Sequence, residues 1–204
     1  MGPNPAIAVH QRQSKICMAS SLAAGKRRAP PGERRDDPLQ ALRTDNRVLT
    51  AIEPRILGID PGVTGGIALL HGADLQVWEI PTIDNEVNPH AVARIVRDAA
   101  PDMAVVERAS SRPGQGVASV FRFGRSYGCL LAVVALEDVP HHLVTPAAWK
   151  RAYRLDADKE ASRGLAARTW PAHSHLFRAK SKHGLAEAGL IALYGRDFLW
   201  RRRP

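Results

Sequence analysis

The stretch RILGIDPGVTGGIALL, residues 55–70, constrains the fold more than any other part of the 204-residue chain. A short apolar strand, 56–59, ends in one carboxylate at Asp60, and the turn through Pro61–Gly62 leads to a second apolar strand, 66–70. Together the two apolar runs predict a β-hairpin. Because a charge next to apolar residues is costly unless it is matched, Asp60 is a candidate binding residue as well as the first residue of a turn.

The periodic segments after this hairpin predict an α/β fold. Three strands in succession precede a helix and a fourth strand, which can rejoin the sheet only through a right-handed crossover and should lie parallel to the first strand. We therefore predict a mixed five-stranded sheet with helices on both faces. The expected strands are 56–59, 66–70, 75–80, 103–106 and 142–144, and the expected helices are 89–99, 117–136, a short one from Pro146, 158–169 and 184–194.

Small residues recur at every fourth position of the expected helix 117–136, at Gly124, Gly128 and Ala132. Such residues form a flat stripe along one side of a helix. We expect this stripe to let the helix approach the sheet closely.

Composition limits the partners and the domain plan. The net charge of +9 favours a polyanion such as nucleic acid. Two cysteines are too few for a disulfide framework, which makes a reducing cytoplasm the expected location, and no uninterrupted apolar stretch indicates a membrane span. Residues 1–54, with scattered prolines and arginines, predict a disordered basic extension before a folded domain at 55–200.

Three acidic positions and one histidine are candidates for a metal site. Asp60 and Glu107 end strands that are expected to be parallel neighbours, about 4.8 Å apart at the carboxyl edge of the sheet. Two such carboxylates tolerate each other when a cation lies between them, and Mg²⁺ prefers oxygen ligands. His183 and Glu187 lie one helical turn apart and complete a possible two-metal site. The alternatives are a simple turn at Asp60, a strand-end ion pair at Glu107 and a surface helix pair.

Four segments in order resemble the RuvC-like family of Holliday-junction resolvases, whose fold is ribonuclease H-like. They are LGIDPGVTGGIAL (57–69), MAVVERASSRPGQGVASVFRFGRSYGCL (103–130), VTPAAWKRAY (144–153) and KHGLAEAGLIALYG (182–195), and the resemblance covers about two-thirds of the chain. The second and third segments are similar to the shorter phage and prophage branch. The first alone would also suit sugar-kinase and actin-like phosphate loops, but the chain is short for two such domains.

The resemblance implies a Mg²⁺- or Mn²⁺-dependent endonuclease acting on branched DNA as a homodimer, with 5′-phosphate and 3′-hydroxyl products. Its metal ligands map to Asp60, Glu107 and Glu187. Glu187 stands where Asp is more usual, and His183 stands near the fourth ligand, where many members carry Asp. The residues expected to contact DNA are Arg112, Phe121, Arg122, Arg125, Lys150, Arg151, Lys180 and Lys182, with Phe123 as an alternative to Phe121.

Two other functions remain open from the sequence. One is a ribonuclease H-fold nuclease that acts on structured RNA. The other is a junction-binding module without full activity, in which His183 marks the loss of the fourth acid.

Overall fold

The computed structural model describes residues 53–108, 110, 114–156 and 158–202. All of them belong to one compact unit, Leu49–Pro204. The expected basic extension, except for its last two residues, lies outside the described residues, and so does Arg112.

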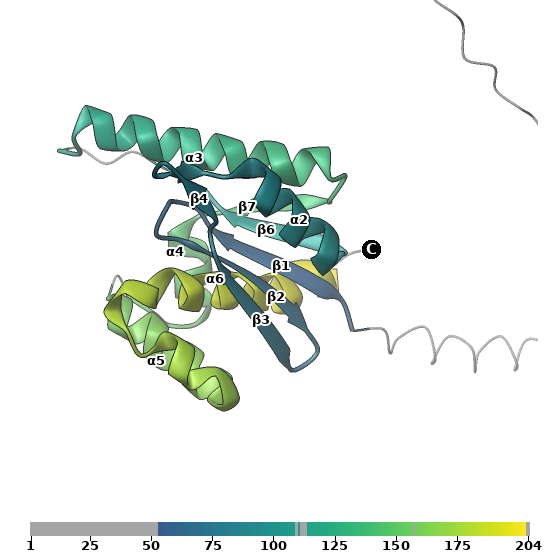
Figure 1. The fold of residues 1–204 in the computed structure, drawn as a ribbon. Helices are drawn as coiled ribbons and strands as arrows, with labels where there is room; N and C mark the ends of the chain where they lie inside the picture. The colour runs from purple at the N-terminus through teal and green to yellow at the C-terminus, as the bar shows by residue number, and fades with distance from the viewer. Residues whose placement is uncertain (1–52, 109, 111–113, 157, 203–204) are drawn as a thin grey trace, which may run out of the picture. The chain divides into compact units, whose positions relative to one another are not determined.

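The core of the unit is a five-stranded mixed sheet in the order β3-β2-β1-β6-β7 (Figure 1). The first strand is antiparallel to β2 and parallel to β6, and β6 is parallel to β7. The five-stranded α/β sheet and its parallel crossover are therefore confirmed. The strands are β1 Arg55–Asp60, β2 Gly66–His71, β3 Asp74–Glu79, β6 Met103–Glu107 and β7 His141–Val144.

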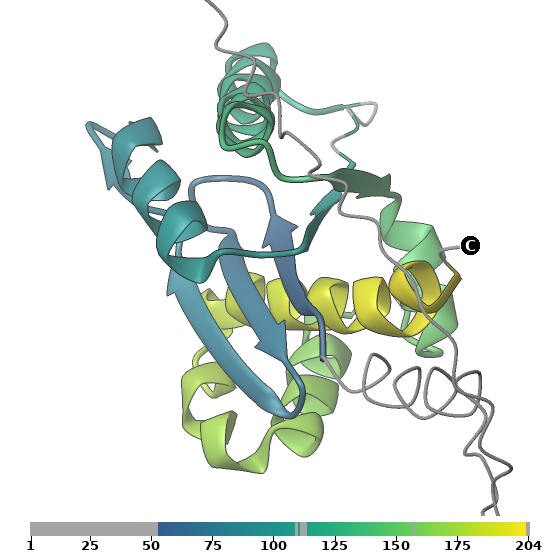
Figure 2. The same ribbon diagram turned by 90° about the vertical axis from the view of Figure 1, so that its right-hand side faces the viewer.

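Helices cover both faces of this sheet (Figures 1 and 2). Helices α2 Pro89–Ala99 and α3 Val117–Leu136 share an apolar core with one face, and α4 Pro146–Ala152, α5 Lys159–Thr169 and α6 His183–Tyr194 share a second core with the other. The short elements that the sequence did not predict are β4 Thr82–Ile83, β5 Glu86–Val87, and the irregular helices η2 Pro171–Phe177, η3 Lys180–Lys182, η4 Gly195–Leu199 and η5 Trp200–Arg202.

Helix α6 lies directly on the strands because glycines remove the side chains between them. A Cβ added to Gly58 of β1 would lie 2.2 Å from the Ala188 carbonyl oxygen. A Cβ on Gly66 of β2 would lie 2.6 Å from the Gly184 carbonyl oxygen. No side chain fits at such distances. The distance from α6 to β1 and β2 is therefore set by contact between backbone atoms.

The predicted role of the small-residue stripe on α3 is wrong. Added Cβ atoms on Gly124 and Gly128 would have no neighbour within 4 Å, and Ala132 is exposed. The stripe faces away from the sheet because the opposite side of α3 carries the apolar residues that enter the core, among them Leu130 and Val134.

The outward face of α3 is unusually apolar. Val117, Phe121 and Leu136 are 87%, 66% and 81% exposed. Within the described residues, α3 is also the one helix whose length and composition would allow it to cross a membrane. It carries Arg122 and Arg125 and contacts α2 and β5 in this structure.

Candidate active site at the carboxyl ends of β1 and β6

Asp60 and Glu107 come together as the strand order predicts. Ile59 of β1 is paired with Val106 of β6 in parallel register, and the next residue of each strand is the acidic one. Asp60 is 9% exposed at the end of β1, where it follows the buried apolar residues 56–59. The two carboxylates therefore belong to adjacent strand ends at one edge of the sheet.

The turn after Asp60 brings the backbone of residues 62–65 close to Asp60. Gly62 has a φ of 133°, which favours glycine, and its carbonyl accepts a hydrogen bond from the Gly65 amide at 3.0 Å. A Cβ on Gly65 would lie 2.0 Å from the Asp60 carbonyl oxygen. Glycine at these positions keeps the chain tightly folded beside the carboxylate.

Glu107 accepts a hydrogen bond from a buried tryptophan. The indole Nε1–H of Trp149 donates to Glu107 Oε2 at 2.6 Å. Trp149 lies on α4, which begins directly after β7, and β7 runs parallel to β6 with Val144 opposite Glu107. Thr145 caps α4 by accepting a hydrogen bond from the Ala148 amide. The helix therefore starts at the same edge of the sheet as the two strand-end acids.

Glu187 is buried on α6 and is held by two side chains. Its Oε1 accepts a hydrogen bond from the Lys150 ammonium at 2.8 Å and another from the Ser162 hydroxyl at 3.3 Å. Glu187 is only 6% exposed, and a buried charge of this kind needs a partner. The partner is Lys150, whose side chain is itself mostly buried. The surface-pair alternative for this acid is therefore wrong.

His183 is the first residue of α6 and is half-buried. Its ring Nδ1 lies 3.2 Å from the Lys180 carbonyl oxygen. A hydrogen bond there requires a proton on Nδ1, which in the neutral ring leaves Nε2 as the atom able to ligate a metal or accept a proton.

The donor set suits a hard divalent cation at the strand ends. Mg²⁺ in proteins is commonly held by one or two carboxylates and several waters, and Asp60 and Glu107 supply two carboxylates on adjacent strands. Among the described residues, no three His, Cys, Asp or Glu side chains gather into a ready-made metal cluster. The assignment of Glu187 and His183 as further ligands stays a prediction.

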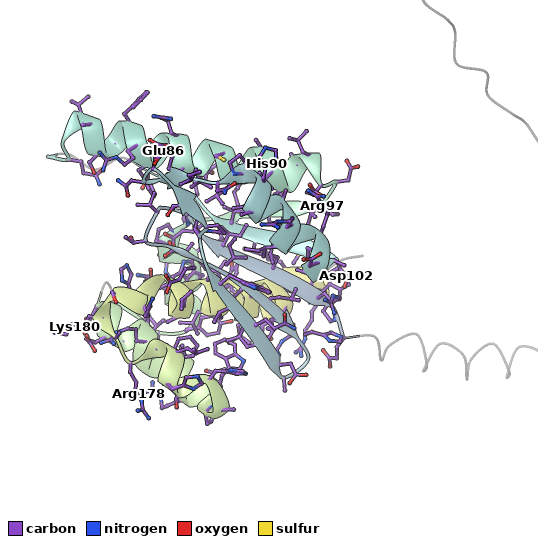
Figure 3. All side chains as sticks on the ribbon, in the orientation of Figure 1. Glu86, His90, Arg97, Asp102, Arg178 and Lys180 are labelled. Atoms are coloured by element: carbon purple, nitrogen blue, oxygen red, sulfur yellow. The ribbon has the colours of Figure 1, made fainter. Side chains whose placement is uncertain are left out.

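The residues predicted to contact DNA have different surroundings. Arg122, Arg151 and Lys180 are exposed. Lys182 pairs with Glu79, and Lys150 is held against Glu187. Figure 3 shows Lys180 and Arg178 at one side of the molecule and Arg97 and Asp102 at the other.

The two phenylalanines of α3 differ in exposure. Phe121 is 66% exposed, and the Arg125 guanidinium lies 5.8 Å from its ring centroid. Arg125 also forms an ion pair with Glu86 at 3.1 Å. Phe123 is half-buried beside Gly62, close to the turn that follows Asp60. Of the pair, Phe121 is the ring that is available to a ligand.

Tyr153, directly after α4, is a poor nucleophile. Burial, and then the negative charge of Asp197, raise the pKa of its phenol above the ordinary value. The phenol stays protonated at neutral pH, so chemistry through a tyrosinate at this position is not supported.

Two residues that contact the acids of the site, Trp149 and Ser162, were not predicted from the sequence. Trp149 was placed on a short helix, but its contact with Glu107 was not predicted, and Ser162 was not singled out. The only signal for Trp149 was a large aromatic residue one turn after the predicted strand 142–144, at the edge that carries the acids.

No protein-family model and no curated protein matches the chain. In shape it is similar to solved structures of RuvC from Thermus thermophilus and of the yeast mitochondrial Holliday junction resolvase Ydc2. The RuvC structure in complex with a Holliday junction substrate is 20% identical, with coverage of 69% of this chain and 94% of that one and a TM-score of 0.49. A second RuvC structure is 22% identical, with 69% and 95% coverage and a TM-score of 0.47. Ydc2 is 18% identical, with 79% and 84% coverage and a TM-score of 0.45. These values describe a likeness of fold.

Proposed function

We propose that this protein is a divalent-metal-dependent endonuclease that cuts four-way junctions or closely related branched DNA. The observation that carries the proposal is the placement of Asp60 and Glu107 at adjacent, parallel strand ends. The four sequence segments that resemble RuvC-like resolvases supply the substrate class.

In this proposal each side chain of the site has a task. Asp60 and Glu107 would hold Mg²⁺ or Mn²⁺ at the sheet edge, and Glu187 and His183 would be the ligands contributed by α6. When bound, such ions polarise a phosphodiester and activate water for in-line attack. Lys150 supplies a counter-ion to Glu187 through an ion pair of 2.8 Å.

Exposed cations support a polyanionic substrate. Among the described members of the predicted contact set, the exposed cations are Arg122, Arg125, Arg151 and Lys180, and Arg125 is paired with Glu86. Contacts to phosphate add affinity without reading sequence, and they make binding weaker as salt concentration rises. Phe121 is the exposed ring that would stack on an unpaired base at a branch point.

The proposal includes a homodimer, because a four-way junction presents two equivalent strands and a two-fold pair of chains presents two sites. The outward face of α3 supports a second copy of this chain as the partner. It combines exposed apolar residues with glycines that let two helices approach closely, and acids are absent from 109–135.

The test is nicking of a fixed and a mobile four-way junction with Mg²⁺, with Mn²⁺ and with EDTA. We expect paired nicks with either metal and none with EDTA. Asp60→Asn should remove cleavage and keep junction binding, because it removes one negative charge and leaves the shape of the side chain. Normal cleavage by the Asn variant would contradict the assignment of Asp60.

The same experiment distinguishes the two other functions. Cleavage of a structured RNA in preference to the junction would favour an RNA-processing nuclease. Junction binding without nicking in either metal would favour a binding module.

A further inference from the structure

Consecutive residues of α4 hold carboxylates from two different elements. Trp149 donates its indole N–H to Glu107 on β6, and Lys150 donates its ammonium to Glu187 on α6. The Lys150 ammonium also lies 5.1 Å from the Trp149 ring centroid. The dipeptide thus connects the strand-end acid to the helix acid.

We infer that Trp149 is a positioning residue for the metal site, an inference that rests on the proposed function. Its indole N–H fixes the orientation of the Glu107 carboxylate, and its ring supports the lysine that holds Glu187. Trp149 is fully buried, so the indole has little freedom to turn away. Hydrogen bonds from outer residues to ligating carboxylates fix their orientation at metal sites.

The chemistry of the donor is suited to this task. An indole N–H is a neutral donor, so it orients Glu107 without compensating the negative charge that a metal would use. A carboxylate oxygen has more than one acceptor position, so accepting the indole proton still leaves it able to bind a cation. Lys150 acts differently, because it brings a full positive charge to Glu187.

The location of Trp149 explains why the contact is firm. The helix that carries it is tied to the sheet by β7, and the Arg108 amide donates to the Val144 carbonyl at 2.7 Å directly beside Glu107. The ring belongs to the core that includes Val105 and Ile191, from β6 and α6. The donor and the acceptor are therefore placed by the same packed core.

The experiment replaces only the N–H. Benzothienylalanine at position 149, introduced by amber suppression, keeps the size of the ring and puts sulfur in place of the indole nitrogen. Trp149→Phe is the genetically simpler variant. Trp170→Phe is the matched control, because Trp170 is buried in the same core, where its ring lies beside Phe177 and Gly189.

The primary readout is Mn²⁺ affinity, measured from the electron paramagnetic resonance signal of free Mn²⁺. We expect both changes at position 149 to weaken Mn²⁺ binding about 10- to 100-fold, and Trp170→Phe to leave it unchanged. Junction affinity in EDTA should stay within about twofold of the unchanged protein, and nicking should recover toward its normal rate at saturating Mn²⁺. Thermal unfolding is recorded for every variant.

Three outcomes would overturn the inference. Unchanged Mn²⁺ affinity in the benzothienylalanine protein would overturn it and leave the proposed function intact if junction nicking is normal. Failure of that protein to fold, with Trp170→Phe folded, would make the hydrogen bond a requirement of the fold and not of the site. A parent protein that neither binds Mn²⁺ nor nicks a junction would overturn the inference together with the proposed function.

Discussion

Lys150 and Glu187 form an ion pair of 2.8 Å between α4 and α6, and both side chains are largely shielded from water. Removal of one partner of such a pair leaves a buried charge without compensation, which is strongly destabilising. The pair therefore affects stability as well as any chemistry at the site.

We predict that Lys150→Met lowers the free energy of unfolding by about 3 kcal/mol, because Glu187 loses its counter-ion. The double variant Lys150→Met with Glu187→Gln should lose less than the sum of the single variants, since no charge is left unmatched. Urea unfolding followed by circular dichroism measures all four proteins. Additive losses, within about 0.5 kcal/mol, would show that the two residues are not coupled.

Gly58→Ala should be one of the most destabilising glycine-to-alanine substitutions in this chain. The new Cβ would meet the Ala188 carbonyl oxygen and the Ala192 amide nitrogen, at 2.2 and 2.5 Å, and the helix would have to move off the strand. We expect a loss of about 3 kcal/mol or more in the same unfolding assay. The control is Gly164→Ala on α5, where the nearest atom is the end of the flexible Arg168 side chain at 3.3 Å. That change should be neutral or should stabilise the protein by up to about 1 kcal/mol.

His183→Ala should slow metal-dependent nicking about tenfold or more if the ring acts at the site. His183→Asp should keep most of the activity, because many members of the family that the sequence resembles carry Asp near this position. His175, an exposed histidine on η2, provides the control variant His175→Ala. Equal nicking rates for His183→Ala and the unchanged protein would remove His183 from the predicted ligand set.

Gly128→Glu should abolish dimerisation through α3, because it places a charge and a side chain where close helix contact is expected. The position has open space around it, so the fold of the single chain should be unaffected. Sedimentation equilibrium should report a monomer, and nicks in the two junction strands should become uncoupled. Gly128→Ala is the smaller change and should still dimerise. A dimer that persists in Gly128→Glu would place the interface elsewhere.

Strand order and the Asp60–Glu107 pair were predictable because both follow from local patterns. Apolar runs, turns and one crossover determine the strand order, and so which strand ends are neighbours. A residue at the end of a parallel strand must then lie at the carboxyl edge of the sheet. The small-residue stripe on α3 was not predictable in the same way. Spacing shows that Gly124 and Gly128 share a side of the helix, but which side faces the sheet depends on the competition with Leu130 and Val134.

Contacts between side chains of distant elements were the part that sequence patterns could not supply. Ser162 on α5 and Lys150 on α4 reach Glu187 on α6, and nothing in their local patterns indicates a common target. Trp149 and Glu107 are separated by 42 positions and meet only because β7 brings α4 to the end of β6.

The glycine contacts between α6 and the hairpin have a consequence for the precision of the site. Side chains between a helix and a sheet can change rotamer and so adjust the gap, but backbone atoms in direct contact have no such freedom. The depth of Glu187 relative to Asp60 is thus determined by main-chain dimensions at Gly58, Gly66 and Gly184. Substitutions elsewhere in the core can therefore change the stability of this protein while the distance between Glu187 on the helix and Asp60 on the strand stays the same.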